Sequence, residues 1–224
     1  VKYLPQADAR GDLARAVLDW GAAGFSLLPI RPDGTKAPAI SWGAIAKGEA
    51  PPLDQESLVE QVVRGSCDGI AVVAGVASGN VEVIELEGRA AERLEDLSRV
   101  ADQLGLHELL QRLLDGCLET SPSGGFHFFY RLSDGVAKPN TKLARRPNPE
   151  DPLKPLILAE TRGQGGYMIC SPSFGRTHDT GRPYEMLVGC LFQSLLPLVQ
   201  RPHDACVFQS IDDLPQIRHF CRLI

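Results

Sequence analysis

The sequence predicts an α+β fold built on a largely antiparallel sheet. Helical and strand patterns are mixed along the 224 residues, and several strands follow one another across short turns, as they do in hairpins. Hydrophobic residues make up 43% of the chain and charged residues 23%, which is ordinary for a globular protein that buries its own core. A chain of this length suits one domain, or one domain with an appendage.

Two helices and one strand are predicted in the first third of the chain. Residues 8–21 and residues 53–64 carry apolar side chains at helical spacing. The apolar stretch 25–30 is a short strand, and residues 31–52 are rich in Gly and Pro and therefore predict a loop.

The next segments predict a hairpin and a helical pair. Residues 69–74 and 81–87 are apolar strands separated by a Gly-rich turn, so we expect them to pair. Residues 89–114 have helical periodicity, and Gly105 predicts a break into two helices.

The second half continues with strands and turns. Residues 117–120 and 126–132 predict another hairpin, and residues 135–155 predict a polar loop. Residues 156–160 and 167–170 are strands joined by a Gly-rich turn, and residues 183–188 add one more strand. We expect one main domain over residues 1–190 and a C-terminal extension of unknown role over residues 191–224.

Charge and composition exclude some classes of protein. A net charge of -5 argues against a simple nucleic-acid coat, because such binding depends on Lys and Arg neutralising phosphates. No apolar run approaches the roughly 20 residues of a membrane-spanning helix, and the first ten residues have no signal pattern, so we expect a cytoplasmic protein with no membrane partner. The cysteines are scattered and predict neither a disulfide framework nor a zinc site.

A pair of acids in the strand 81–87 is the first candidate site. Side chains alternate along a strand, so Glu85 and Glu87 project from one face while Ile84 and Leu86 project from the other, toward helices. Adjacent carboxylates repel unless a cation lies between them, and hard oxygen ligands suit Mg²⁺ or Mn²⁺. Taken alone, the pair is more often a solvated strand end, because acidic pairs on sheet faces are common.

A histidine and a third acid strengthen the metal hypothesis. His127 shares a strand face with Phe129 and follows the turn Ser121-Pro122-Ser123-Gly124-Gly125, whose hydroxyl and backbone groups are typical of an anion site. Glu160 ends a strand and leads into the Gly-rich turn that contains Arg162. A lone His or a Gly-rich turn has a structural role more often than a functional one.

In this order the residues resemble the Prim-Pol domain of bifunctional DNA primase/polymerases, in the archaeo-eukaryotic primase superfamily. The first matching segment is Gly75-Val76-Ala77-Ser78-Gly79 followed by Glu85-Leu86-Glu87. The second is Ser121-Pro122-Ser123-Gly124-Gly125-Phe126-His127. The third is Glu160-Thr161-Arg162-Gly163-Gln164-Gly165-Gly166-Tyr167, with Ser171-Pro172-Ser173 after it.

Two further features belong to this resemblance. Lys36-Ala37-Pro38 with Trp42 is similar to an upstream segment of the family. The family usually has Asp where this chain has Glu85 and Glu160, and often where it has Glu87.

The resemblance implies a fold, a metal and a reaction. The fold is an RRM-like mixed sheet with helices on one face and the active site on the open face. The reaction is template-directed nucleotidyl transfer to a 3′-hydroxyl by a DNA primase/polymerase, with two divalent cations, Mg²⁺ or Mn²⁺, held by Glu85, Glu87 and Glu160.

The same resemblance assigns the remaining site residues and partners. His127 is expected to act with the three acids, and the nucleotide is expected to contact Ser123, Gly124, Gly125, His127, Arg162 and Lys36. Residues 138–154 form a basic segment with no acid before Glu150. This basic segment is expected to bind template DNA through Lys138, Lys142, Arg145 and Arg146. Implied partners are single-stranded template with primer, nucleoside triphosphates, and a helicase or another replication protein.

Two other functions remain open from sequence. A site with Glu at all three acid positions could belong to a catalytically weak or inactive Prim-Pol-like module that only binds nucleic acid or nucleotide. The same acids could serve a metal-dependent phosphohydrolase, although the sequence lacks the further His and Asp ligands that such sites usually contain.

Overall fold

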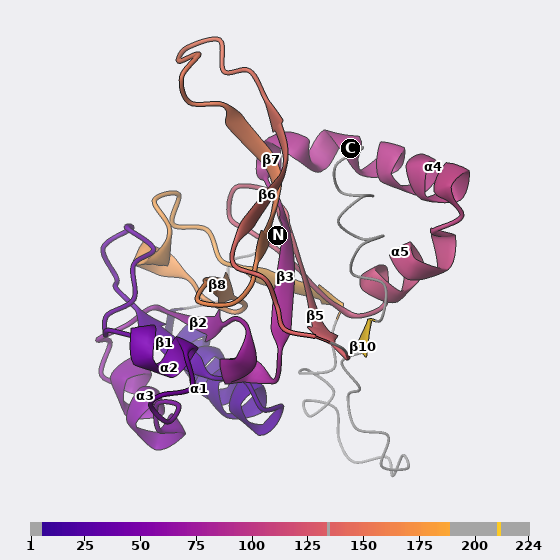
Figure 1. The fold of residues 1–224 in the computed structure, drawn as a ribbon. Helices are drawn as coiled ribbons and strands as arrows, with labels where there is room; N and C mark the ends of the chain where they lie inside the picture. The colour runs from indigo at the N-terminus through magenta and orange to yellow at the C-terminus, as the bar shows by residue number, and fades with distance from the viewer. Residues whose placement is uncertain (1–5, 134, 189–209, 212–224) are drawn as a thin grey trace, which may run out of the picture.

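The computed structural model describes residues 6–133, 135–188 and 210–211, which form two sheets with helices against both (Figure 1). The smaller sheet has the order β1-β2-β8 and is antiparallel throughout. The larger sheet has the order β6-β7-β3-β5-β4-β9, all antiparallel, and β10 adds a parallel pairing to β5. The strands are β1 (Leu27–Ile30), β2 (Gly69–Val73), β3 (Val81–Leu86), β4 (Cys117–Thr120), β5 (Phe126–Leu132), β6 (Thr141–Arg146), β7 (Leu156–Arg162), β8 (Tyr167–Cys170), β9 (Glu185–Val188) and β10 (Ser210–Ile211).

The helices correspond closely to the periodic segments of the sequence. Asp54 caps α3 by accepting a hydrogen bond from the backbone N–H of Ser57 at 2.8 Å. Gly105, with φ 69°, separates α4 from α5 as predicted, because a left-handed residue ends a helix. The helices are α1 (Gln6–Ala22), α2 (Gly43–Ala46), α3 (Gln55–Val63), α4 (Leu94–Leu104) and α5 (His107–Leu114), with 3₁₀ turns η1 (Val76–Ser78), η2 (Gly88–Arg93) and η3 (Gly175–Thr177).

One face of the larger sheet packs on α4 and α5. Ile84 and Leu86 of β3 and Phe128 and Tyr130 of β5 form a buried cluster with leucines of these two helices, among them Leu110. Burying each such side chain stabilises the fold by roughly 1.5–3 kcal/mol. The predicted facing of β3 and β5 is therefore confirmed.

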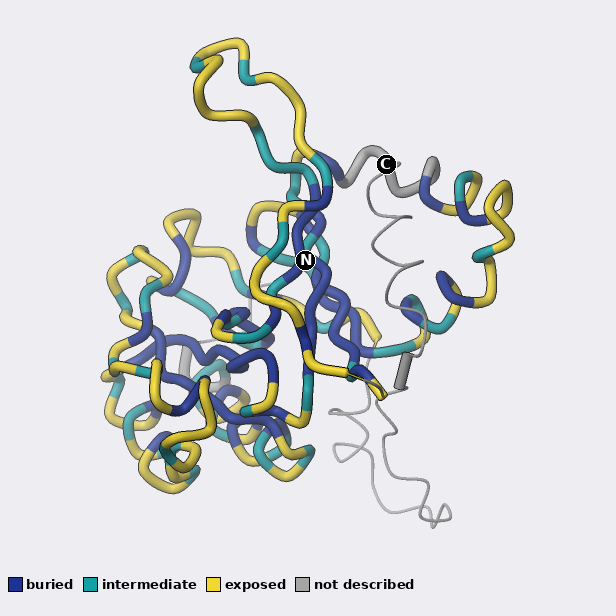
Figure 2. Tube along the Cα trace, viewed as in Figure 1, coloured by how far each residue is buried: buried dark blue, intermediate teal, exposed yellow. Residues whose placement is uncertain are grey.

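The opposite face of the larger sheet is covered over part of its length. Val83 and Phe129, which share the face of Glu85, lie in a second core with Trp20 of α1 and Val72 of β2. Trp20 is fully buried, and its ring centroid lies 5.3 Å from that of Phe129. The smaller sheet with α1 and α3 thus packs against the first half of β3, at Val81 and Val83, whereas Glu85 lies further along the strand. The tube of Figure 2 shows buried backbone through both sheets.

The predicted α+β class with a largely antiparallel sheet is confirmed, but three details of the prediction are wrong. Residues 31–52 are not all loop, because they contain the short helix α2. The segments 69–74 and 81–87 do not form a hairpin, because β2 pairs with β1 and β8 while β3 pairs with β5 and β7. Residues 135–155 are not all loop, because they contain β6, which pairs with β7. The two strands of this pair extend from the body of the protein as an arm (Figure 1).

The expected C-terminal extension, residues 191–224, lies outside the described residues except for β10. Among the helices that the structure describes, none is both long and apolar enough to cross a membrane.

Candidate metal and nucleotide site

Three carboxylates from two neighbouring strands converge at the end of β3. One oxygen from each of Glu85, Glu87 and Glu160 lies within 4.8 Å of the others. Their side chains are 17%, 23% and 11% exposed, so each is partly withdrawn from solvent yet still reachable from outside. A cluster of this size matches the reach of carboxylates around a divalent cation.

Strand pairing explains why residues so distant in sequence meet. Glu85 stands directly opposite Glu160 in the antiparallel register of β3 and β7, and paired residues project from the same face. Glu87 follows two positions after Glu85, and its backbone N–H donates to the Leu158 carbonyl at 3.0 Å. The sheet therefore fixes all three backbone positions.

Arg162 is paired with two of these acids. Its Nη2 donates to Glu160 Oε1 at 2.6 Å and to Glu85 Oε2 at 3.0 Å, and its Nε donates to Glu85 Oε2 at 3.1 Å. Burial lowers the pKa of Arg162, but the carboxylates around it raise that pKa by more, so the guanidinium is firmly charged.

The carboxylate cluster is short of positive charge even with Arg162 in place. Burial raises the pKa of Glu87 and also that of Glu160, Glu85 raises both further, and Glu87 adds to the rise at Glu160. One guanidinium does not outweigh burial and two like charges, which is why Glu160 has a raised pKa despite its ion pair. Glu87 has weaker cationic neighbours, with Arg89 Nη2 3.5 Å from its Oε2 and Lys36 nearby. The three converging carboxylates remain a donor set that fits a divalent cation.

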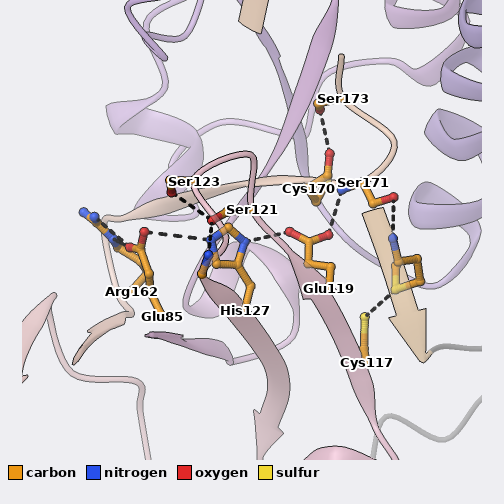
Figure 3. Close-up of polar contacts among 12 residues, drawn as sticks. Glu85, Cys117, Glu119, Ser121, Ser123, His127, Arg162, Cys170, Ser171 and Ser173 are labelled. Carbon is orange, nitrogen blue, oxygen red and sulfur yellow. Dashed lines mark hydrogen bonds and ion pairs between the residues drawn. The ribbon is translucent and has the colours of Figure 1, made fainter. Parts of the chain in front are cut away.

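His127 lies beside the acids, and Glu119 contacts the other side of its imidazole ring. Its Nε2 lies 3.8 Å from Glu85 Oε1, and its Nδ1 lies 2.7 Å from Glu119 Oε1 (Figure 3). His127 and Glu119 are 2% and 0% exposed. The ring of Tyr184 packs against the imidazole at 5.9 Å.

Glu119 is the main residue that sequence reasoning missed. The hairpin of β4 and β5 was predicted, and its register places Glu119 directly opposite His127. The available signal was a glutamate that directly follows two apolar residues in a strand of only four residues. Tyr184, in a segment without a motif, gave no such signal.

The Ser-Pro-Ser-Gly-Gly turn is tied together by its own polar groups. The N–H of Gly124 donates to the Ser121 carbonyl at 2.9 Å, and the N–H of Gly125 donates to Ser121 Oγ at 3.0 Å. A Cβ on Gly125 would lie 2.3 Å from the Leu86 carbonyl oxygen, so that glycine permits contact with β3 rather than with a ligand. Ser123 Oγ lies 3.1 Å from Ser121 Oγ and is exposed.

The predicted Lys36 lies near the acids as well. Its charge acts to lower the pKa of Glu87, and its backbone has φ 62°. The Tyr167 hydroxyl donates to the Lys36 carbonyl at 3.1 Å, and the Tyr167 ring meets Trp42 edge-on at 5.1 Å. These contacts hold the segment of Lys36 against the turn that follows Glu160.

Gln164 fastens that turn to the N-terminal part of the protein. Its Nε2 donates to the Ala46 carbonyl at 2.6 Å, and its Oε1 accepts from the Val76 N–H at 2.9 Å. A Cβ on Gly75, whose φ is 82°, would lie 2.1 Å from Gln164 Oε1. The glycine that opens the first motif is therefore required by contact with the third.

The basic residues Lys138, Lys142, Arg145 and Arg146 are exposed and lie on β6 or just before it. Lys142 stands opposite Glu160 in the register of β6 and β7, so it shares the face of the acids. The basic segment thus borders the carboxylate cluster along the neighbouring strand.

Comparison with known proteins identifies a family for this arrangement. The family model described as "Bifunctional DNA primase/polymerase, N-terminal" (Prim-Pol) matches residues 18–215, which include the acids, His127, Lys36 and the basic segment. The match indicates a function of primase/polymerase type and nucleotidyltransferase chemistry. In a search of curated proteins, none matched this chain.

Proposed function

We propose that this chain, which belongs to the Prim-Pol family of bifunctional DNA primase/polymerases, catalyses template-directed transfer of nucleotides to a primer 3′-hydroxyl during DNA replication. The observation that carries the proposal is the convergence of Glu85, Glu87 and Glu160 within 4.8 Å. They lie on one sheet face beside a buried histidine, and all belong to the segment that the family model matches.

Glu85, Glu87 and Glu160 are the residues that would hold Mg²⁺ or Mn²⁺. When bound, such cations neutralise triphosphate charge and lower the pKa of the attacking hydroxyl. Arg162 keeps Glu85 and Glu160 aligned through its three hydrogen bonds, so the protein itself presents the ligands in a prepared arrangement.

Cationic and hydroxyl groups around the acids would bind the nucleotide. His127 directs Nε2 toward Glu85, and Lys36 approaches Glu87 from the N-terminal part of the protein. Arg162 and the exposed Ser123 complete the set, with Gly124 and Gly125 shaping the turn that carries Ser123. These groups suit the phosphates of a nucleoside triphosphate.

The β6–β7 arm would bind the single-stranded template. Its exposed Lys142, Arg145 and Arg146, with the nearby Lys138, offer a row of cations next to the acids, whereas the chain as a whole is acidic. Phosphates of a template-primer would follow this row into the site. A helicase or another replication protein would be a partner of such an enzyme.

The test is primer extension by the purified protein on single-stranded DNA with labelled dNTPs, first with Mg²⁺ and then with Mn²⁺. We expect chain growth that is lost in a Glu85→Gln, Glu87→Gln variant by a factor on the order of 10² or more, because metal ligands contribute several kcal/mol to the transition state. The matched control is Glu108→Gln on α5, an exposed glutamate away from the cluster.

Two outcomes would contradict this proposal. A wild-type protein that adds no nucleotide with either metal would not be a polymerase, and an unchanged rate in the double variant would remove Glu85 and Glu87 from the reaction. Circular dichroism of both variants distinguishes loss of chemistry from loss of fold.

One observation favours a second function, a catalytically weak module that binds nucleotide or nucleic acid. All three acids are Glu, and two of them are already paired with Arg162. Tight binding of a nucleoside triphosphate or of single-stranded DNA, without incorporation under either metal, would support this function instead.

A further inference from the structure

The buried carboxylate of Glu119 lies behind the site and has no role in the function proposed above. We propose that Glu119 is a positioning residue for nucleotide addition, which holds a proton on His127 Nδ1 and thereby fixes Nε2 toward the acids. This inference rests on the proposed function for its kinetic consequence, while its structural part can be tested independently.

Strand pairing holds the side chains of Glu119 and His127 next to each other. Glu119 and His127 stand opposite each other in the β4–β5 register, and Glu119 Oε1 lies 2.7 Å from His127 Nδ1. Both side chains are buried, at 0% and 2% exposure, so no solvent competes for this bond. The imidazole can then present its other nitrogen, Nε2, toward Glu85 Oε1 at 3.8 Å.

The second oxygen of Glu119 fixes the carboxylate itself. Glu119 Oε2 accepts the backbone N–H of Ser171 at 2.7 Å (Figure 3). Ser171 is in turn anchored, because its carbonyl accepts the indole N–H of Trp20 at 3.0 Å and its Oγ accepts the N–H of Met186 at 3.1 Å. The Ser171-Pro172-Ser173 segment therefore acts on the site through Glu119.

With a hydrogen on His127 Nδ1, two N–H donors face the two oxygens of Glu119, and only a carboxylate accepts from both. A glutamine has one acceptor oxygen and one NH₂ group, so it would leave either His127 or Ser171 facing a second donor. A buried glutamate is costly unless both oxygens are bonded, and here both are. The side chain thus has the number of acceptors that its two neighbours need.

The tautomer of His127 distinguishes the two possible directions of the bond. Burial raises the pKa of Glu119 by more than its interactions with His127 and with the N–H of Ser171 lower it, so electrostatics alone do not assign the proton. If the carboxyl carried the proton, it would donate to Nδ1 and leave the hydrogen on Nε2. If Glu119 is ionised, Nδ1 carries the hydrogen, and this is the arrangement that we propose.

The first experiment determines which ring nitrogen of His127 carries the hydrogen. We would record imidazole ¹⁵N–¹H correlation spectra of the full chain at neutral pH and assign His127 by comparison with a His127→Gln variant. We expect the wild type to show a hydrogen on Nδ1 and the Glu119→Gln variant to lose that pattern. A wild type with hydrogen on Nε2 and a bare Nδ1 would overturn the proposal, and this result needs neither activity nor a folded Glu119→Gln variant.

The second experiment is a double-mutant cycle on primer extension with Glu119→Gln and His127→Ala. We expect Glu119→Gln to raise the KM for dNTP about tenfold or more in the wild-type background and to change it less than about twofold when His127 is already Ala. An equal effect in both backgrounds would show that Glu119 acts on the fold rather than through His127, and would overturn the proposal.

A buried glutamate elsewhere in the sheet supplies the matched control. Glu82 is also 0% exposed, but it accepts a hydrogen bond from Tyr130 on the opposite face. We expect Glu82→Gln to leave the KM for dNTP unchanged. If the wild type adds no nucleotide at all, the proposed function fails, while the His127 spectrum still decides whether Glu119 fixes the imidazole.

Discussion

Arg162 Nη2 lies 2.6 Å from Glu160 Oε1, although the two residues are only two positions apart on the same strand. Alternation places both side chains on the face of the acids, and the same guanidinium also reaches Glu85 at 3.0 Å. Arg162 is thus the fixed counter-charge of the carboxylate cluster.

Removal of this counter-charge should make the fold depend on divalent cations. We expect Arg162→Gln to lose about 1–3 kcal/mol of stability without metal, which is less than for a fully buried ion pair because the Arg162 side chain is 32% exposed. Addition of Mn²⁺ should raise the melting temperature of the variant more than that of the wild type. Thermal unfolding with and without Mn²⁺ checks this, and equal metal effects on both proteins would contradict it.

The metal-free protein should lose stability as the pH rises through the weakly acidic range. The pKa values of Glu87 and Glu160 are both raised above 4.5, with burial as the largest cause. Above pH 4.5 the unfolded chain has released these protons while the folded protein still holds them, so stability falls until the pH exceeds the folded pKa values.

Glu87→Gln removes one of these groups and should flatten the decline. We expect a higher melting temperature than wild type at pH 7.5 without metal, together with weaker primer extension. The measurement is a series of thermal melts from pH 4 to pH 8, with Glu108→Gln as the exposed control. Stability that rises with pH over this window would contradict the prediction.

Replacement of all three acids by aspartate should distinguish an active polymerase site from a catalytically weak module. Each change shortens a ligand by about 1.5 Å, while the strands hold the backbone of Glu85 and Glu160 in fixed register. If the site is adapted to glutamate, we expect the Glu85→Asp, Glu87→Asp, Glu160→Asp variant to extend primers at least about tenfold more slowly. A large gain in activity would instead favour the weak, non-catalytic module.

The basic arm should account for much of the salt dependence of DNA binding. For a Lys142→Ala, Arg145→Ala, Arg146→Ala variant, we expect the slope of log K against log salt to fall by roughly 0.7 per lost phosphate contact on single strands. Fluorescence anisotropy with labelled oligonucleotide at several salt concentrations measures this slope. The charge-matched control is an Arg15→Ala, Lys47→Ala, Arg64→Ala variant, whose changed residues are exposed on the N-terminal part of the protein. An equal change in the slope for this control would mean that net charge, rather than the arm, determines the salt dependence.

Local patterns in the sequence predicted most elements but not how they are divided between two sheets. The alternation in β3 and β5 placed Ile84 and Phe128 correctly toward the helices. The local sequence does not show that β2 and β3 belong to different sheets, because one partner of β2 is β8, about 100 residues later. Long-range pairing is decided by tertiary packing, so the adjacent strands 69–74 and 81–87 were joined incorrectly.

Motif order predicted the acids and His127 but not the groups that support them. Glu119 and Gln164 act through contacts with single atoms of distant segments, as in the bond from Gln164 to Ala46. Such contacts depend on register and loop conformation, which residue type alone does not specify.

The pairing of β2 with β8 also has a consequence for synthesis of the protein. At about 5–20 residues per second, a ribosome needs roughly 5–20 s to travel from Ile70 to Cys170, which are 100 residues apart. During that interval β2 has β1 on one side and an unpaired backbone on the other. A nascent chain that stalls before residue 167 would therefore expose an apolar strand edge that can pair with other chains and aggregate. We expect such a chain to depend on chaperones.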